Sequence, residues 1–356
     1  MQRYDEQYAI TSQLDPIRDL LAYTRFMCAR EYVEDLLRGT YGLGSRECKA
    51  HARRIVAHVE VACDYVEECL GAPAGVALVC GYYAMLNMAK ACILVGPKSG
   101  QLSQERWHGA AYGGHRKASR NLLTEEVTVR EKGVVPLFYE TVTGATLRHD
   151  VTLRMRDVFP FLVQISADLH AAAATRKPFV IASWSTKVDK AGAVRGTIML
   201  HEYGESGTLT KGLTKRKVLL MGPGWKRVST KPLTYATIET KVAGQDTRSL
   251  LCRNVRRHLL YRNPPGLRGK RVGNEGLELG LTPVCGRLEM FEELSLLLAF
   301  FHMSNVSRYN PEFLSALRDS RFWPVLLVLK RQGMFDAMQL FWSFMHKKAL
   351  LLTHGG

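Results

Sequence analysis

Apolar residues recur every three to four positions through most of the first hundred residues, a spacing that predicts amphipathic helices. Asp15 followed by Pro16 is typical of a helix start, and the pattern after it predicts a helix that runs on to about residue 37. Residues 45–70 form the next predicted helix. A third, over about 75–95, is apolar nearly all round and is therefore expected at the centre of a helical bundle.

Strand patterns begin after residue 125, where β-branched and aromatic residues gather in short runs. The predicted strands are 126–129, 179–184, 194–201 and 235–242, and a helix is expected between them over 157–173. Helix patterns return after residue 244, over 249–261, 286–303, 311–320 and 323–352. A glycine- and arginine-rich stretch that ends near residue 284 is predicted to be a loop.

These patterns predict an α+β fold that is predominantly helical, with a strand-rich segment inserted into a helical bundle. We expect residues 1–120 to form the N-terminal part of the bundle and residues 121–245 to form the mixed, strand-rich segment. Residues 246–356 are expected to be a C-terminal helical part that packs back on the N-terminal helices.

Residues 69–89 carry no charge, which raises the question of a membrane span. Gly71, Pro73 and Asn87 lie in this stretch, so a buried helix after a turn fits it better. The N-terminus lacks the apolar run of a signal peptide, and the eight cysteines form no CxxC pair and no zinc-ligand spacing with histidine. We therefore expect a cytoplasmic protein with reduced cysteines, no metal, no cofactor and no membrane contact.

The formal net charge is +16, and +14 of it falls in residues 177–275. A concentrated cationic segment attracts polyanions, which favours RNA or another nucleic acid as the partner. The alternative is a solvated basic face that serves solubility. The predicted nucleic-acid contacts are Lys215, Arg216, Lys217, Lys226, Arg227, Arg256, Arg257, Arg262, Arg268, Lys270 and Arg271.

Two islands of sequence, far apart in the chain, combine aromatic and basic residues with glycine or proline. Their members are Tyr82, Tyr83, Lys90, Ala91, His108 and Gly109 in the first, and Arg308, Tyr309 and Pro311 in the second. In this order they resemble the YaaC-like family of bacterial proteins. The chain has Phe313 and Leu314 where that family tends to place a tryptophan.

Four residues of these islands are candidates for a site. His108 would present its imidazole to a cleft beside Tyr82 and Tyr83, or serve as a hydrogen-bonded structural histidine. Arg308, at the predicted end of a helix, is either a site residue or an arginine that satisfies helix carbonyls.

The helical part of the YaaC-like family is similar to the HEPN superfamily (higher eukaryotes and prokaryotes nucleotide-binding), whose active members are metal-independent ribonucleases. The resemblance implies a HEPN-like bundle that binds or cuts RNA. The ribonuclease signature is Arg, then commonly Asn, Asp or His, then a few residues and a His. Arg253, Asn254 and His258 match it.

Chemistry and geometry give the Arg253–His258 pair two interpretations. A neutral His258 could take the proton of a ribose 2′-hydroxyl while Arg253 holds the scissile phosphate. On a helix, however, a five-residue offset places the two side chains about 140° apart, so they would converge only at a helix end or across a homodimer. The alternative is a phosphate-binding helix without catalysis.

Three functions therefore fit the sequence. The first is an RNA-binding protein that acts as a metal-independent endoribonuclease in stress response or phage defence. The second is a nonenzymatic nucleic-acid-binding or assembly subunit that works with partner proteins. The third is a nucleotide-binding regulator. All three bind phosphate, so the basic segment does not distinguish them.

Overall fold

The computed structural model describes residues 7–12, 15–105, 107–113, 121–159, 288–354, the single residues 162, 165, 169 and 172, and the strands that lie within 179–285. These residues form a predominantly helical α+β fold with two compact units. One unit, here called the sheet unit, comprises Met1–Asp5 and Ala174–Val284. The other, the helical unit, comprises Glu6–Ala173 and Cys285–Gly356.

The helical unit contains long helices from both ends of the chain. They are α1 (Pro16–Met27), α2 (Arg30–Tyr41), α3 (Ser45–Gly71), α4 (Ala74–Leu94), α5 (Val134–Thr143), α6 (Met155–Val158), α10 (Glu292–Tyr309), α11 (Pro311–Arg318) and α12 (Trp323–His346). Two 3-10 turns, η1 (Ser99–Ser103) and η2 (Leu122–Thr124), lie in its connections.

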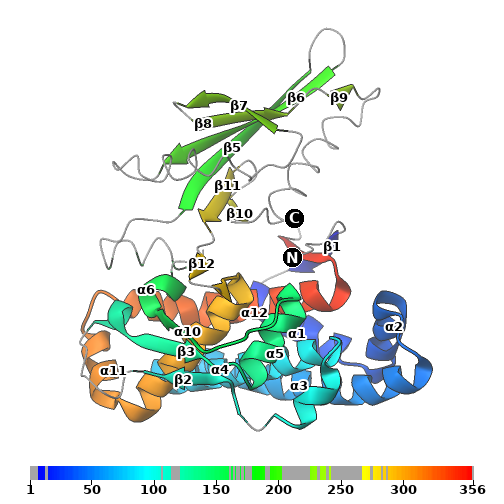
Figure 1. The fold of residues 1–356 in the computed structure, drawn as a ribbon, viewed down its shortest axis with the longest axis vertical. Coiled ribbons are helices and arrows are strands. Elements are labelled where there is room, and N and C mark those ends of the chain that lie inside the picture. The colour runs from blue at the N-terminus through cyan, green and yellow to red at the C-terminus, as the bar shows by residue number, and fades with distance from the viewer. Residues whose placement is uncertain are drawn as a thin grey trace. The chain divides into compact units, whose positions relative to one another are not determined.

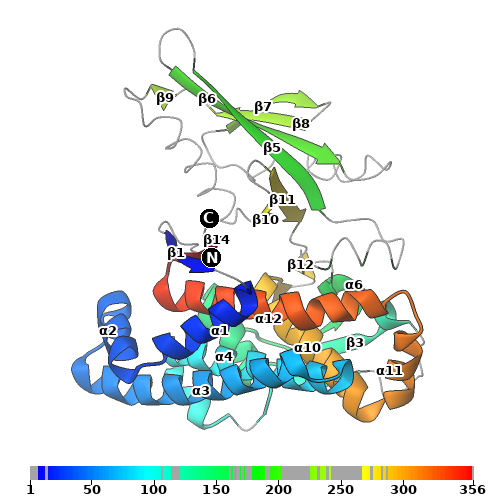
Figure 2. The same cartoon turned by 180° about the vertical axis from the view of Figure 1, so that it is seen from behind.

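Helix α4 is the centre of this unit, as its all-round apolar pattern predicts. It packs against α3, α5, α10 and α12. Figure 2 shows α1 and α3 on one side of α4, and Figure 1 shows α5 and a small sheet on the other. Among the described helices, α4 alone is long and apolar enough to cross a membrane, and 78% of its apolar window is buried inside the protein. It is therefore the core helix that the sequence suggested.

The predicted helix from Asp15 to about residue 37 is two helices. Its start is confirmed, because the Asp15 carboxylate accepts a hydrogen bond from the backbone N–H of Ile17 at 3.2 Å. The chain then turns at Cys28, and α2 begins at Arg30. The apolar pattern continues through the break because both helices bury one face in the same core, so periodicity alone did not show it.

Two small sheets complete the helical unit. Strands β2 (Ala110–Tyr112), β3 (Glu126–Val129) and β4 (Val151–Arg154) form an antiparallel sheet, of which only β3 was predicted. Strands β1 (Gln7–Ser12) and β14 (Ala349–His354) pair in parallel. The predicted last helix therefore ends early, at His346, because Lys347 adopts a left-handed conformation with φ of 51°.

The sheet unit is built on a seven-stranded antiparallel sheet with the order β10-β11-β5-β6-β8-β7, to which β9 adds by pairing with β6. The strands are β5 (Phe179–Val188), β6 (Ala193–Glu202), β7 (Trp225–Thr230), β8 (Leu233–Thr237), β9 (Thr240–Lys241), β10 (Leu267–Val272) and β11 (Gly276–Leu281). Strands β5 and β6 confirm two predictions. The predicted loop before residue 284 is wrong, because it holds β10 and β11, and the predicted helix 249–261 lies outside the described residues.

Two further short strands, β12 (Val284–Cys285) and β13 (Leu288–Glu289), pair with each other. The predicted helix 157–173 overlaps the end of α6, and beyond residue 159 it is described only at residues 162, 165, 169 and 172.

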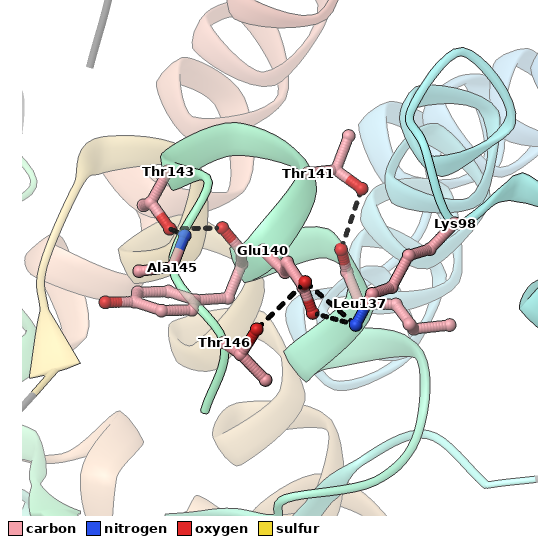
Figure 3. Close-up of polar contacts among 8 residues, drawn as sticks. Lys98, Leu137, Glu140, Thr141, Thr143, Ala145 and Thr146 are labelled. Carbon is pink, nitrogen blue, oxygen red and sulfur yellow. Dashed lines mark hydrogen bonds and ion pairs between the residues drawn. The ribbon is translucent and has the colours of Figure 1, made fainter. Parts of the chain in front are cut away.

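A polar cluster fixes α5 beside the end of α4 (Figure 3). The Lys98 ammonium lies 2.8 Å from both carboxylate oxygens of Glu140, and the Thr146 hydroxyl donates to the same carboxylate at 3.0 Å. Both members of the ion pair are mostly shielded from solvent, so the pair is stronger than an exposed one. The start of α5 in turn supports the candidate site described next.

Candidate functional site

Tyr82 and His108, which the sequence places 26 residues apart, are hydrogen-bonded partners. Tyr82 lies on the buried side of α4, and its hydroxyl is 2.6 Å from His108 Nδ1. The Tyr82 ring also packs edge-on against Phe301 of α10, with 5.3 Å between ring centroids. Burial raises the pKa of Tyr82, so its phenol keeps its proton near neutral pH.

The loop that carries His108 is held by the N-terminus of α5. The first backbone N–H groups of that helix, at Val134 and Val135, donate to the carbonyls of Trp107 and His108 at 3.1 and 2.9 Å. Gly109 has a φ of 79°, and a Cβ there would lie 2.5 Å from Pro136 Cδ. Glycine is therefore required after the histidine, which explains the His-Gly pair of the sequence.

A second hydrogen-bonded path leads from the neighbouring Tyr83 to α3. The amide of Asn87 donates to the Tyr83 carbonyl at 2.9 Å, and its Oδ1 lies 3.0 Å from His58 Nδ1. The Tyr83 ring stacks on Tyr65 of α3, with centroids 5.4 Å apart and planes inclined by 25°. Tyr82 and Tyr83 also touch, at 5.3 Å between centroids. We call the set Tyr82, Tyr83, Asn87, His58 and His108 the tyrosine–histidine cluster.

Two cations flank this cluster. Lys90 follows Asn87 on α4 and is partly buried, which lowers the pKa of its ammonium. Arg308 lies at the end of α10, where its guanidinium donates to the Ser304 carbonyl at 3.2 Å and to the Ser304 hydroxyl at 3.4 Å. Arg308 therefore does satisfy a helix carbonyl, as one of its two interpretations expects, and it remains exposed beside the cluster.

Both imidazoles of the cluster are neutral near pH 7. Burial is the main cause that lowers the pKa of His108, and the positive charges of Lys90 and Arg308 lower it further. Burial is also the main cause that lowers the pKa of His58; the hydrogen bond to Asn87 raises it in part, and the positive charges of Lys90 and Arg54 lower it further. Within the part of the chain that the structure describes, no carboxylate forms an ion pair with Lys90 or Arg308. The site is cationic and lacks internal neutralisation.

The structure thus brings Tyr82, Tyr83, His108 and Arg308 to one place, although the two islands are far apart in sequence. His58 was not expected there. Arg53 and His58 form one of several Arg-x4–6-His matches in the sequence. About as many such matches are expected by chance, so the spacing alone gave no signal. Only the packing of α3 on α4 assigns His58 to the site.

The basic residues of the sheet unit are arranged by strand register. Residues that pair directly in an antiparallel sheet share a face, and neighbours along a strand alternate between faces. The pairings Lys187↔Arg195, Lys226↔Ala236 and Lys270↔Glu278 therefore trace one face through the sheet. Six cationic positions fall on it, and we call this the basic face: Lys187, Arg195, Lys226, Lys241, Arg268 and Lys270.

The opposite face is apolar in sequence. It has the positions of Val180, Trp184, Ile198, Leu200, Tyr235, Leu277 and Leu279. Arg227 and Arg271 also fall on that face, through their pairs with Tyr235 and Leu277. Strand register therefore places the cationic residues of β7 and β10 on both faces of the sheet, although they are close together in the sequence.

Several predicted site residues lie outside the described residues. They are the signature residues Arg253, Asn254 and His258 and the basic residues Lys215, Arg216, Lys217, Arg256, Arg257 and Arg262.

One buried polar cluster was not anticipated. His302 of α10 is fully buried, and its Nε2 lies 3.8 Å from a carboxylate oxygen of Glu125, which accepts a hydrogen bond from the Tyr112 hydroxyl at 3.1 Å. Burial lowers the pKa of His302 to about 3 and raises the pKa of Glu125. A neutral imidazole at 3.8 Å forms no ion pair, and neither ring nitrogen has a hydrogen-bond partner. We therefore expect this cluster to lower the stability of the fold, and we do not assign it a functional role.

The described residues contain no group of three His, Cys, Asp or Glu residues that could hold a metal ion. An apolar pocket between α4, α5, α10 and α12, lined by Met85, Met88, Phe138 and Phe341 among others, has a volume of about 20 Å³. That is room for about one water molecule and not for a cofactor.

A family model described as YaaC-like Protein matches residues 25–329. No curated protein and no solved structure matches the chain. The matched span includes the tyrosine–histidine cluster, the strands of the basic face and Arg308.

Proposed function

This chain belongs to the YaaC-like protein family, and we propose that it binds RNA through the basic face of its sheet unit. The observation that carries this proposal is the register, which gathers six cationic positions on one face of a single sheet. Cations spread over neighbouring strands match a polyanion whose phosphates repeat along a chain.

Salt dependence gives the first test of this proposal. Each phosphate that a cation neutralises contributes about −0.7 to the slope of log K against log salt for a single strand. Six engaged cations would give a slope of about −4. We expect fluorescence anisotropy with a labelled single-stranded RNA to show a steep slope, and salt-insensitive binding would contradict an electrostatic grip.

Two arginines of β10 provide a matched pair of variants. Arg268 lies on the basic face, whereas Arg271 lies on the apolar face of the same strand. We expect Arg268→Gln to weaken RNA binding severalfold and to reduce the salt slope by about 1, because one phosphate contact is lost. Arg271→Gln, with the same change of charge, is expected to leave binding within about twofold. Equal effects of both variants would mean that RNA binding depends on the total charge of the sheet unit and not on the face that carries the charge.

The proposal has a sharper form, in which the protein is a HEPN-like, metal-independent endoribonuclease. It is supported by the Arg253–Asn254–His258 signature and is compatible with the predominantly helical fold of the helical unit. This form would place the protein in the cytoplasm, in stress response or phage defence. A homodimer would let the two signature residues converge.

Cleavage of labelled total RNA with EDTA present tests the nuclease. We expect the full chain to cut, and we expect Arg253→Ala and His258→Ala to bind RNA without cutting it. Binding without cutting by any of the three proteins would leave the RNA-binding proposal intact and would favour an assembly subunit.

A further inference from the structure

We propose that Cys28 and Cys63 form a reversible disulfide bond when the protein is exposed to a peroxide. Cys28 directly follows the last residue of α1, and Cys63 lies in the second half of α3. Both are free thiols that are buried in the same hydrophobic core. The pair belongs to the helical unit, so its oxidation does not depend on RNA binding by the sheet unit.

An ion pair holds the last turn of α1 against the turn of α3 that carries Cys63. The Arg25 guanidinium donates to the Glu67 carboxylate at 2.6 Å and lies 3.5 Å from the Asp64 carboxylate. Asp64 directly follows Cys63, and Glu67 lies one turn further along the same helix. On α1, the Arg25 carbonyl accepts a hydrogen bond from the backbone N–H of Cys28 at 3.2 Å. These contacts bring two distant cysteines to the same place.

The two thiols interact directly. The pKa of the Cys28 thiol is raised, chiefly by its side-chain hydrogen bond with Cys63 and also by burial. Cys28 therefore keeps its proton, and Cys63 is the member of the pair that reacts as a thiolate. Among the causes that raise the pKa of Arg25, the negative charge of a Cys63 thiolate follows the contacts with Glu67. The cation beside Cys63 thus favours the form of sulfur that attacks an oxidant.

The break between α1 and α2 gives an oxidant access to the pair. Ala29 is the N-cap of α2 and makes no side-chain hydrogen bond, so the first turn of that helix is weakly held. Phe26 and Ala29, close to Cys28 on either side, are both exposed. Local opening of this break costs less free energy than unfolding of the core. We therefore expect oxidation at a slow rate that is set by this opening.

The oxidation balances with hydrogen peroxide as the oxidant. The Cys63 thiolate attacks one peroxide oxygen, the O–O bond breaks, and the leaving hydroxide takes up the proton that Cys63 released. The Cys28 sulfur then attacks the sulfenic sulfur of Cys63, the S–O bond breaks, and water leaves with the Cys28 proton. The two thiols lose two electrons and two protons, and the peroxide is reduced to two water molecules. Dithiothreitol reverses the reaction by thiol–disulfide exchange.

Peptide mapping of the full chain after treatment with hydrogen peroxide tests the bond. Free thiols are first blocked with iodoacetamide, and the chain is then cut with trypsin and a glutamate-specific protease. These enzymes place Cys28 in the peptide 26–30 and Cys63 in the peptide 61–67, each without another cysteine. We expect these two peptides, joined by a disulfide, as the main oxidised product, and we expect dithiothreitol added before blocking to separate them.

Variants distinguish the pair from oxidation elsewhere in the chain. Cys28→Ala and Cys63→Ala each remove one partner and are expected to abolish the joined peptides. Cys48→Ala is the matched control and should keep them, because Cys48 lies on the same helix as Cys63 and is equally buried. The bond closes a long loop, so peroxide is expected to raise the Tm of the full chain by about 5–10 °C and to leave that of Cys28→Ala unchanged.

The proposal would be overturned by a peroxide-treated full chain in which Cys28 and Cys63 stay reduced. It would also be overturned if Cys63 bonds to another cysteine, such as Cys69, or stops at the sulfinic acid. A bond between Cys28 and Cys63 that fails to raise the Tm would equally contradict it, because the folded helices would then not accommodate the bond.

Discussion

Burial determines the pKa of several side chains in the helical unit. Tyr82, His108 and His302 are all shielded from solvent, and in each case burial is the largest cause of the altered pKa. Their surroundings differ. Tyr82 and His108 satisfy each other with one hydrogen bond, whereas the two ring nitrogens of His302 have none. The first pair is therefore expected to stabilise the fold, and the lone histidine is expected to weaken it.

Tyr82→Phe tests the hydrogen bond to His108. The variant keeps the buried ring but leaves His108 Nδ1 without its partner, so we expect the free energy of unfolding to fall by about 1–2 kcal/mol. Urea unfolding measures this change. Tyr65→Phe is the control, because Tyr65 contributes its ring to the stack on Tyr83 and the variant keeps that ring. An equal loss in both variants would show that the Tyr82 hydroxyl has no special role.

His302 is expected to make the fold sensitive to acid. Its pKa in the folded protein, about 3, lies below its value in the unfolded chain, so the unfolded chain takes up the proton first as pH falls. The stability is therefore complete above about pH 6.5 and is lost toward pH 3, by up to about 1.4 kcal/mol per pH unit. The raised pKa of Glu125 acts in the opposite direction.

Replacement of this histidine by leucine should remove that acid sensitivity. We expect His302→Leu to be as stable as the natural protein or more stable at pH 7, because it deletes two unsatisfied buried nitrogens. Its unfolding free energy, measured by urea titration at several pH values, should fall less between pH 6.5 and 4. His149→Gln, at an exposed position, should keep the original slope. An unchanged slope in His302→Leu would assign the acid sensitivity to other groups.

At the scale of elements, close helix packing depends on glycines in particular positions. Gly81 of α4 faces the Phe300 ring of α10 so closely that an added Cβ would overlap ring atoms. Gly39 of α2 has nothing within 4 Å of the place where a Cβ would lie. Both glycines carry the same cost in helix propensity, so only their surroundings distinguish them.

Alanine at these two positions should have opposite effects. Gly81→Ala forces Phe300 out of its place, and we expect it to lower the free energy of unfolding by about 1–3 kcal/mol. Gly39→Ala should raise it by up to about 1 kcal/mol, because it removes backbone freedom from the unfolded chain. Thermal and urea unfolding measure both. A stabilised Gly81→Ala protein would mean that α4 and α10 separate at little cost.

At the scale of the whole molecule, the helical unit is assembled from two distant stretches of chain. Its first part ends at residue 173 and its second begins at residue 285. Strands β1 and β14 pair near the two chain ends and link these parts. The helical unit thus has its own core and its own closure, which suggests that it can fold without the sheet unit.

Excision of residues 177–284 tests that independence. We expect a chain joined by a twelve-residue Gly/Ser linker, which spans about 20 Å on average, to keep its helix content and to unfold cooperatively. Salt-sensitive RNA binding should be lost with the basic face. Circular dichroism, calorimetry and anisotropy measure the three properties, and a shortened chain that never folds would show that the helical unit needs the inserted segment.

Prediction from sequence succeeded for elements that carry a long apolar pattern of their own. It failed for elements that depend on pairing with another strand. Helices α3 and α4 have long apolar patterns, and their bounds were predicted within a residue or two. Strands β2 and β4 are three and four residues long and depend on pairing with β3, so they left no pattern of their own. Strands β10 and β11 are rich in glycine, which is typical of loops, and pairing overrides that preference.

By itself, the sequence determined the predominantly helical class, the central position of α4, the location of the excess charge and the family. Each of these depends on local periodicity, composition or ordered motifs, which a chain carries before it folds. Only the tertiary structure decided that Lys90 lies near both His58 and His108, that Arg268 and Arg271 lie on opposite faces, and that His302 is buried without a hydrogen-bond partner. Those facts depend on which segments pack together, because contact between distant residues is set by the core and by strand register rather than by any local pattern.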